Sequence, residues 1–379
     1  MTIHINGAGL MGRAIGYDLV NHSKEDIVFV DADETTLATA ADFVDGDQVT
    51  TTTVDIASRS AYGEFLEAEA PELVINALPH ELSVPALTSI VDTGIDAIDL
   101  AFEEEQRELA ETASEQDVTM ITGCGVAPGI SNMLAGDGIY RVDEPESASI
   151  KVGGIPADPQ PPLEYRVVFH LNSVWNAYTR PATIVRDGER IEVPPLSGTE
   201  SVRFEGVGEL ECFYTDGLGT LPYTFDTVPN LEEKTIRYPG HSMKAKTLRE
   251  CGLLDETPME INGMEISPRE FLTELLTPDL YLGDEEDLTV LRVEVENNAG
   301  ERYEASMVDR YDTDTDMTSM ARTTGFTASI VAQKLLAGRI EDTGLVAPET
   351  LAADQGLLSA IFDELAARGI EIDRSGPGT

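Results

Sequence analysis

At 379 residues, 41% of them hydrophobic, the chain is too long for one ordinary domain and has enough apolar residues to build a core in each of two. Its 70 acidic residues outnumber 25 Lys and Arg residues and give a net charge of −45, so nucleic acids and anionic membranes are poor partners. The acids are spread between regularly spaced apolar residues. We therefore expect a folded protein with a surface suited to concentrated salt, and not a disordered acidic tail.

No stretch approaches the ~20 apolar residues of a membrane helix, and residues 1–4 look like the start of a strand and not like a signal peptide. The three cysteines, Cys124, Cys212 and Cys251, are odd in number and far apart. This argues against a disulfide framework and favours a reducing cytoplasm. Neither a His-x-x-x-His nor a Cys-x-x-Cys pattern occurs, so we expect no metal site.

The first informative stretch is residues 6–12, Asn-Gly-Ala-Gly-Leu-Met-Gly, which follows a short apolar strand and precedes a helical pattern. This G-x-G-x-x-G arrangement predicts a dinucleotide-binding βαβ unit. Gly7 permits the tight turn, Gly9 lets a pyrophosphate approach the backbone, and Gly12 lets the helix pack close to the strand. The residues expected to face the pyrophosphate are Gly7, Gly9, Leu10 and Met11.

The next predicted strand, residues 27–30, ends at Asp31. A carboxylate at this position accepts hydrogen bonds from the adenosine ribose and repels a 2′-phosphate, so we expect NAD as the cofactor and NADP to be less suitable. Asp33 competes for the same role, but its position favours the N-cap of the following helix.

Strands and helices then alternate, which predicts a doubly wound parallel sheet, that is, a Rossmann domain. The expected strands are residues 49–54, 73–77, 97–100 and 118–122, and the expected helices are residues 34–44, 61–69, 85–93 and 103–115. Ligands of such sheets bind outside the carboxyl ends of the strands. We therefore expect Asn76, Ala77, Leu78 and Pro79 to face the nicotinamide half, and Asp99 to lie at the same edge.

A glycine-rich loop follows the last of these strands. Residues 123–132, Gly-Cys-Gly-Val-Ala-Pro-Gly-Ile-Ser-Asn, run directly into an apolar helix over residues 133–140. Such a loop either approaches a ligand or serves as an interdomain hinge, and both interpretations remain open.

From residue 147 the pattern changes to period two, which predicts an antiparallel sheet. The expected strands are residues 148–153 and 165–170, a hairpin over 183–193 with Asp-Gly at its turn, and a second hairpin over 288–308. Helices over residues 317–337 and 351–368 would return to the first domain, where a strand over 370–372 would extend its sheet. We thus predict a Rossmann domain over residues 1–130, an α+β substrate and oligomerisation domain over 131–315, and C-terminal helices over 316–379.

Residues 234–249 hold three lysines, two arginines and a histidine, an anomaly in so acidic a chain. A basic cluster of this kind marks a place where an anion is held. Arg237 is our candidate for the substrate carboxylate, because a guanidinium donates two parallel hydrogen bonds. The alternative is that each basic residue pairs with a surface acid.

Three blocks resemble the saccharopine dehydrogenase superfamily, and most closely its lysine 6-dehydrogenase branch. They are residues 123–132, residues 235–241 (Thr-Ile-Arg-Tyr-Pro-Gly-His) and residues 320–326 (Met-Ala-Arg-Thr-Thr-Gly-Phe). The resemblance implies a Rossmann domain with an α/β substrate domain that commonly supports oligomerisation, and oxidation of an amine of a lysine-type amino acid with NAD or NADP. Where saccharopine reductases carry two acids, this sequence has Ala127 and Ser131, which argues against saccharopine itself.

Together these features predict an oxidoreductase that removes hydride from an amine-bearing carbon and produces an imine. The reaction needs a deprotonated amine, and the candidates for the base are Asp99, His241 and Lys244. Weaker candidates for substrate contacts are Asn132, Tyr178 and Arg322, and Cys124 is either near the nicotinamide or simply buried. A reductase that joins an amino acid to a keto acid, and an NAD-binding protein without turnover, remain alternatives.

Overall fold

The structure, a computed structural model, describes residues 1–167, 171–283 and 285–379. The chain divides into two compact units, each described by itself below. Unit 1 consists of Met1–Tyr140, Gly219–Thr224 and Ala321–Ile370, and unit 2 of Arg141–Leu218, Phe225–Met320 and Glu371–Thr379. The predicted first boundary is at residue 130, whereas the next ten residues group with unit 1.

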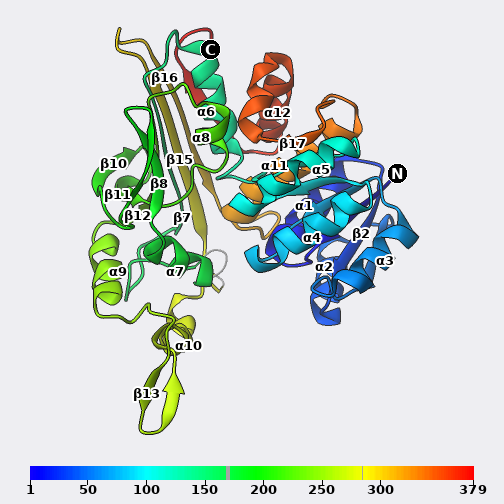
Figure 1. Cartoon of the computed structure of the whole chain (residues 1–379), viewed down its shortest axis with the longest axis horizontal. Coiled ribbons are helices and arrows are strands. Elements are labelled where there is room, and N and C mark those ends of the chain that lie inside the picture. The colour runs from blue at the N-terminus through cyan, green and yellow to red at the C-terminus, as the bar shows by residue number, and fades with distance from the viewer. Residues whose placement is uncertain (168–170, 284) are drawn as a thin grey trace. The chain divides into compact units, whose positions relative to one another are not determined.

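Unit 1 is built on a parallel sheet of seven strands, which confirms the doubly wound fold (Figure 1). In spatial order the strands are β17 (Gly344–Val346), β6 (Thr119–Ile121), β5 (Asp96–Asp99), β4 (Leu73–Asn76), β1 (Thr2–Asn6), β2 (Asp26–Asp31) and β3 (Val49–Thr53). The prediction that residues 370–372 extend this sheet is wrong, because β17 pairs with β6 at that edge. β17 has only three residues, which is too short for a hydrophobic pattern to predict a strand there.

The helical segments of unit 1 follow the alternation expected from the sequence, with two breaks. They are α1 (Leu10–His22), α2 (Glu34–Val44), α3 (Arg59–Glu69), α4 (His80–Asp92), η1 (Glu104–Leu109), α5 (Ala110–Glu115), α6 (Ile130–Arg141), α8 (Leu221–Thr224), α11 (Ser319–Leu336), η2 (Pro348–Ala353) and α12 (Gln355–Ala367). The helix expected over 103–115 is a 3₁₀ segment followed by a short α-helix, and the one expected over 351–368 is likewise divided. Asp354 causes the second break, since its side chain caps α12 by accepting from the N–H groups of Gly356 and Leu357.

A buried polar contact joins the first and last helices of unit 1. The carboxylate of Asp18 on α1 accepts hydrogen bonds from Oγ of Ser329 on α11 at 2.6 Å and from Nε of Arg368 at 2.5 Å. Asp18 and Arg368 are both buried. This ion pair fixes the C-terminal helices against the nucleotide-binding βαβ unit.

Unit 2 is built on a mixed sheet of nine strands, in which β7 and β12 run parallel and the other pairs antiparallel. Its main path is β10 (Glu200–Phe204), β11 (Gly208–Tyr214), β12 (Asn230–Arg237), β7 (Ser147–Pro156), β15 (Asp287–Glu296), β16 (Arg302–Arg310) and β18 (Asp373–Ser375), while β8 (Ala182–Arg186) pairs with β12 and with β9 (Glu189–Val193). Both predicted hairpins are confirmed. The first turns at Asp187 and Gly188, which have φ values of 52° and 79°, as a two-residue hairpin turn requires.

Three helices complete unit 2: α7 (Leu171–Thr179), α9 (His241–Glu250) and α10 (Pro268–Leu280). A small hairpin of β13 (Met259–Ile261) and β14 (Met264–Ile266) projects beside α10 (Figure 1). The strand expected over 165–170 begins as irregular chain with a single bridge from Val167 to Tyr281, and residues 168–170 lie outside the described residues.

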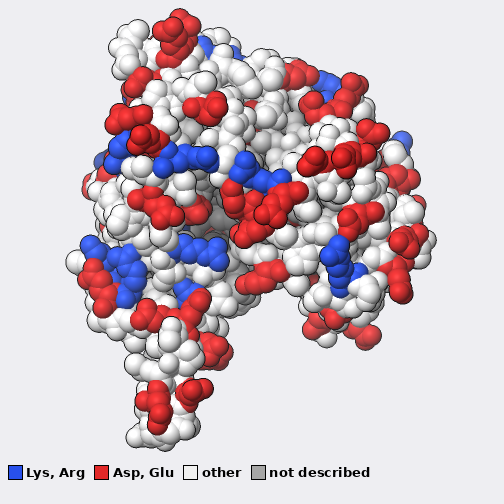
Figure 2. All heavy atoms as spheres, in the orientation of Figure 1, with Lys and Arg blue, Asp and Glu red and all other residues white. Residues whose placement is uncertain are grey.

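Acidic side chains are distributed over the whole face shown in Figure 2, with Lys and Arg residues among them. This matches a net charge of −45 carried along the chain and not in a tail. Of the helices in the described parts of the chain, none has the length and hydropathy to cross a bilayer.

Candidate functional site

The loop between β1 and α1 is shaped for close approach of a ligand to the backbone. Gly7 has a φ of +87°, and a Cβ there would lie 2.5 Å from the carbonyl oxygen of Ala77. A Cβ on Gly12 would lie 1.9 Å from the carbonyl oxygen of Gly7, so the first turn of α1 packs directly on the loop. A Cβ on Gly9, by contrast, would have no described atom within 4 Å, which leaves open space above the loop.

The N-terminus of α1 is suited to a phosphate anion. Gly9 occupies the N-cap position, and within the described chain no side chain caps this end and no acid lies in the first turn. Leu10 and Met11 form the first turn, so the backbone N–H groups there are available to an anion. These features fit a dinucleotide pyrophosphate, as the sequence predicts.

Asp31, at the end of β2, is held by backbone donors. Its Oδ2 accepts from the N–H of Ala8 at 2.9 Å and its Oδ1 from the N–H of Asp33 at 3.0 Å. The carboxylate therefore lies beside the glycine loop, where a ribose is expected. Asp33 accepts from the N–H groups of Thr35 and Thr36 and caps α2, so the prediction of its capping role is confirmed.

A buried hydrogen-bond network links the carboxyl ends of β1, β4 and β5. Nδ2 of Asn6 donates to Oδ1 of Asn76 at 2.6 Å, and Nδ2 of Asn76 donates to Oδ2 of Asp99 at 3.2 Å. Asp99 also accepts from Oγ of Ser83 at 2.7 Å and from the N–H of Ala101 at 2.8 Å. Burial raises the pKa of Asp99 to about 6, although these donors oppose the shift. The carboxylate of Asp99 thus accepts three hydrogen bonds, and one of them positions the side chain of Asn76.

The segment after β4 lies beside the glycine loop. The N–H of Ala77 donates to the carbonyl oxygen of Asn6 at 2.8 Å, and a side-chain carbon of Leu78 would lie 3.5 Å from a Cβ on Gly7. Pro79 is the N-cap residue of α4. The structure thus brings Asn76, Ala77, Leu78 and Pro79 to the same strand ends as the glycine loop.

The glycine-rich loop over residues 123–130 folds tightly onto unit 1. A Cβ on Gly129 would lie 1.9 Å from the carbonyl oxygen of Gly125, and the Ala127–Pro128 peptide bond is cis. Cys124 is fully buried, and burial raises the pKa of its thiol to about 12. Cys124 is therefore a protonated, packed side chain in this fold.

Asn132 and Arg322 both have polar contacts inside unit 1. Nδ2 of Asn132 donates to Glu349 Oε2 at 3.3 Å, and Oγ1 of Thr224 donates to Glu349 Oε1 at 2.7 Å. Burial raises the pKa of Glu349 above its usual range. Nη2 of Arg322 donates to the carbonyl oxygen of Arg368 at 2.9 Å. Glu349 is a buried carboxylate that the sequence analysis did not single out, since its short 3₁₀ segment has no signal.

Arg237, at the end of β12 in unit 2, is buried at 4% exposure. Its Nε donates to Oη of Tyr178 at 3.3 Å, its Nη1 donates to the carbonyl oxygen of Ile236 at 2.8 Å, and its guanidinium lies 4.3 Å from the ring centroid of Tyr165. Among the described residues it forms no ion pair with an acid, unlike most other basic residues of the segment. A buried cation with no described carboxylate within ion-pair distance is an arrangement that an anionic substrate group would complete.

His241 contacts the same Tyr178 hydroxyl that accepts from Arg237. Its Nε2 is 2.7 Å from Tyr178 Oη, and its Nδ1 is 2.8 Å from the carbonyl oxygen of Leu163, which can only accept. The neutral Nδ1–H tautomer follows, with Nε2 accepting from Tyr178. Burial and the charge of Arg237 lower the pKa of His241 to about 3. His241, one of the three candidates for the base, is thus neutral and hydrogen-bonded through both ring nitrogens.

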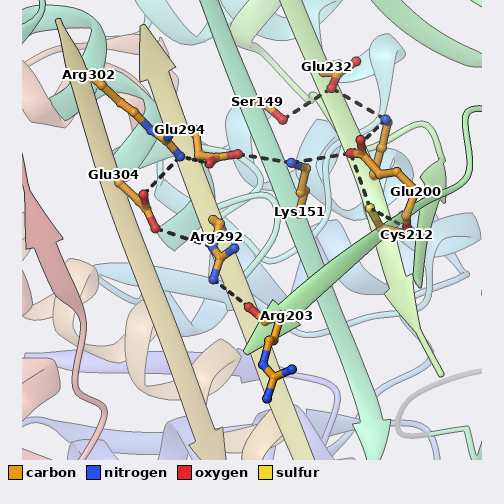
Figure 3. Close-up of polar contacts among 11 residues, drawn as sticks. Ser149, Lys151, Glu200, Arg203, Cys212, Glu232, Arg292, Glu294, Arg302 and Glu304 are labelled. Carbon is orange, nitrogen blue, oxygen red and sulfur yellow. Dashed lines mark hydrogen bonds and ion pairs between the residues drawn. The ribbon is translucent and has the colours of Figure 1, made fainter. Parts of the chain in front are cut away.

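The remaining basic residues do not form one anion site. Lys244 pairs with Glu164, Lys246 with Glu250 at 3.8 Å, and Lys234 with Glu200 at 3.0 Å. Figure 3 shows the neighbouring network in unit 2, where Lys151 contacts both Glu200 and Glu294, and Arg302 contacts Glu294 and Glu304. For these lysines the alternative interpretation, pairing with acids, is the correct one.

Comparison with known proteins identifies the family of the chain. It matches the saccharopine dehydrogenase NADP binding domain over residues 3–121 and the saccharopine dehydrogenase C-terminal domain over residues 125–370. The chain belongs to the saccharopine dehydrogenase family. It is accordingly an oxidoreductase with an NAD(P)-binding Rossmann domain, as the sequence resemblance implied.

Individual family members are distant relatives. A saccharopine dehydrogenase (NADP⁺, L-glutamate-forming) of Schizosaccharomyces pombe is 22% identical over 80% of this chain and 83% of its own length. The mouse mitochondrial alpha-aminoadipic semialdehyde synthase is also 22% identical, but this chain covers 40% of its length. Among solved structures, saccharopine dehydrogenase (L-Glu forming) of Saccharomyces cerevisiae has a TM-score of 0.80 at 19% identity, with 99% of both chains covered. Homospermidine synthase of Legionella pneumophila has a TM-score of 0.69 at 12% identity, covering 99% of this chain and 91% of its own.

Proposed function

We propose that this saccharopine dehydrogenase family member oxidises the amine-bearing carbon of lysine or a related amino acid, with NAD as the hydride acceptor. The single observation that carries the proposal is Arg237, a buried guanidinium with no acid partner in the described residues. Such a group suits a substrate carboxylate, and an amino acid supplies one. Family membership supports the reaction class.

The nicotinamide, when bound, would accept hydride from the amine-bearing carbon and so convert the amine to an imine, which water hydrolyses to an aldehyde and ammonia. The glycine loop and the N-terminus of α1 would hold the pyrophosphate, and Asp31 the adenosine ribose. Asn76 is positioned by Asn6 and Asp99 at the strand ends. Arg237 would orient the substrate through its carboxylate.

The preference for NAD rests on the charge at the end of β2. Asp31, Asp33 and Glu34 are acidic, and residues 31–36 contain no Lys or Arg that would bind a 2′-phosphate. The matched family domain is described as NADP-binding, so nucleotide choice is the finer point to test.

We propose that the substrate ammonium loses its proton to bulk water before it binds. The three candidate bases are all occupied by other contacts. Asp99 accepts three hydrogen bonds, His241 is hydrogen-bonded through both ring nitrogens, and Lys244 is paired with Glu164. We infer that the free amine binds directly, so that kcat/KM increases with pH toward the pKa of the substrate amine, about 10 for a lysine side chain.

The proposal is tested with the purified full-length chain in concentrated KCl. NADH and NADPH formation would be followed with L-lysine, other amino acids, saccharopine and 1,5-diaminopentane. Ammonia release with an amino acid and NAD supports the proposal. Turnover only when an amino acid and a keto acid are joined supports the saccharopine-type alternative, which the names of the relatives favour. Binding of NAD without any turnover indicates a non-catalytic protein.

A further inference from the structure

Two buried hydroxyl groups in unit 2 have no hydrogen-bond partner in the described part of the chain. They are Oη of Tyr165 and Oγ1 of Thr289, on side chains that are 1% and 0% exposed. Buried hydroxyls in folded proteins are nearly always bonded, because an unpaired one has lost its water without compensation. Each of these two hydroxyls is therefore available to a partner that is not part of the described chain.

Both hydroxyls belong to the surroundings of Arg237. The guanidinium lies over the ring of Tyr165, with 4.3 Å between Cζ and the ring centroid. Tyr165 also interacts electrostatically with Asp287, which lies two residues before Thr289 on β15. Tyr165 is thus near the end of β12 and near the start of β15.

The register of the sheet places Arg237 and Thr289 at the same level, two strands apart. Thr289 is opposite Gly154 on β7, and Thr235 is opposite Val152, so Arg237 reaches the level of Gly154 from the other side. All three residues share one face of the sheet, because side chains alternate along a strand. With neighbouring strands about 4.8 Å apart, Arg237 and Thr289 are roughly 10 Å apart at Cα, and the residue between them has no side chain.

All three groups can donate a hydrogen bond, and Arg237 is charged as well. Burial raises the pKa of Tyr165 to about 12, so its hydroxyl keeps its proton. Thr289 carries a neutral hydroxyl, and Arg237 a permanent positive charge. Two neutral donors beside a permanent positive charge fit an anion with two oxygens, whereas the charge of Arg237 repels an ammonium group.

We propose that Tyr165 and Thr289 join Arg237 in holding the substrate carboxylate, and that these two hydroxyls set the preference for an amino acid over the corresponding amine. This inference rests on the proposed function, because it assigns further donors to the same substrate group. The hydroxyls are unpaired in the free protein because their partner arrives with the substrate.

The test uses Tyr165→Phe and Thr289→Val in the full-length protein, since each removes only the hydroxyl. We expect the KM for L-lysine to increase about tenfold in each variant, while the KM for 1,5-diaminopentane, which has no carboxylate, stays constant. The Tm without substrate should stay constant or increase by about 2–4 °C, because an unpaired buried hydroxyl is removed and no bond is lost.

Matched controls come from buried hydroxyls that are bonded. Tyr238 donates to the carbonyl oxygens of Pro156 and Ala157 at 2.9 Å, and Thr327 donates to the carbonyl oxygen of Thr323 at 2.7 Å. Tyr238→Phe and Thr327→Val should therefore lower the Tm.

A lowered Tm in Tyr165→Phe or Thr289→Val, or an unchanged KM for L-lysine in an enzyme that requires a carboxylate, would overturn the assignment of the hydroxyls and leave the proposed function intact. Wild-type enzyme that turns over only amines without a carboxylate would overturn both.

Discussion

The hydroxyl of Tyr178 joins Arg237 to His241: it accepts from Nε of the arginine at 3.3 Å and lies 2.7 Å from Nε2 of the histidine. The carbonyl oxygen of Leu163 accepts from Nδ1 of His241 and so fixes the histidine tautomer. Nε2 of His241 then accepts from Tyr178, which in turn accepts from Arg237, so the donor of each hydrogen bond is determined. The guanidinium is therefore held in place by neutral groups, and its positive charge remains available to a ligand.

Replacing Tyr178 with Phe should weaken both stability and substrate binding. The change leaves Nε of Arg237 and Nε2 of His241 buried without partners, at a cost of about 1–3 kcal/mol in the free energy of unfolding. We also expect a KM for the amino acid about tenfold higher and a smaller change in kcat, because orientation of the carboxylate is lost. Urea denaturation and steady-state kinetics measure the two effects. A normal KM in a variant of reduced stability would limit Tyr178 to a structural role.

Removing the charge of Asp31 should change nucleotide preference. Asp31→Asn keeps a side-chain oxygen for the N–H of Ala8 but removes the repulsion of a 2′-phosphate. We expect the ratio of the NADP Kd to the NAD Kd to fall about tenfold, measured by fluorescence titration. Asp42→Asn, on an exposed site of α2, is the control and should leave the ratio constant. Equal ratios in wild type and Asp31→Asn would contradict the assignment.

Breaking the contact between Asp18 and Arg368 should destabilise unit 1. Asp18→Ala removes the buried carboxylate that accepts from Nε of Arg368 and leaves that guanidinium with the half-exposed Glu364 as its acid partner, so we expect a loss of about 1–3 kcal/mol. The exposed pair of Arg59 and Asp92 provides the comparison, since Asp92→Ala should cost less than about 1 kcal/mol. Chemical denaturation in concentrated salt distinguishes the two, and equal effects would show that burial of the Asp18 pair is unimportant.

Glu233 predicts a pH dependence of stability. It is buried on β12, and burial raises its pKa to about 8, above the usual value of 4.5. The folded protein thus favours the protonated carboxyl, so this stabilisation is complete below pH 4.5 and is lost as the pH rises to about 8. Thr215 donates to this carboxyl at 2.7 Å, while Asp216 and Glu232 favour and Arg237 opposes its protonation.

Glu233→Gln should remove that dependence. Between pH 5 and 8.5 the Tm of wild type should fall more steeply than that of Glu233→Gln, and the variant should be the more stable of the two at pH 8.5 by about 1–3 kcal/mol. Thermal unfolding at several pH values provides the measurement. Parallel Tm curves would mean that Glu233 has an ordinary pKa.

Local sequence was sufficient for features that depend on neighbouring residues. The glycine loop, the N-cap at Asp33 and the Asp187-Gly188 turn each follow from backbone conformations that few residue types adopt, and all three are present. The parallel sheet was predictable from the alternation of strands and helices, because parallel neighbours need a crossover that is usually a helix. Period two also separates Lys234 from Arg237, since residues three apart on a strand lie on opposite faces.

Tertiary structure decided everything that requires residues distant in the sequence to meet. Only the fold shows that Lys234 has an acid partner and that Arg237 has none among the described residues, because ion pairing depends on strands from other parts of the chain. The same holds for Asp18 and Arg368, 350 positions apart, and for the ring of Tyr165 beneath Arg237. Burial, which sets the pKa of His241 and of Glu233, belongs to the packed protein as a whole and has no local signature.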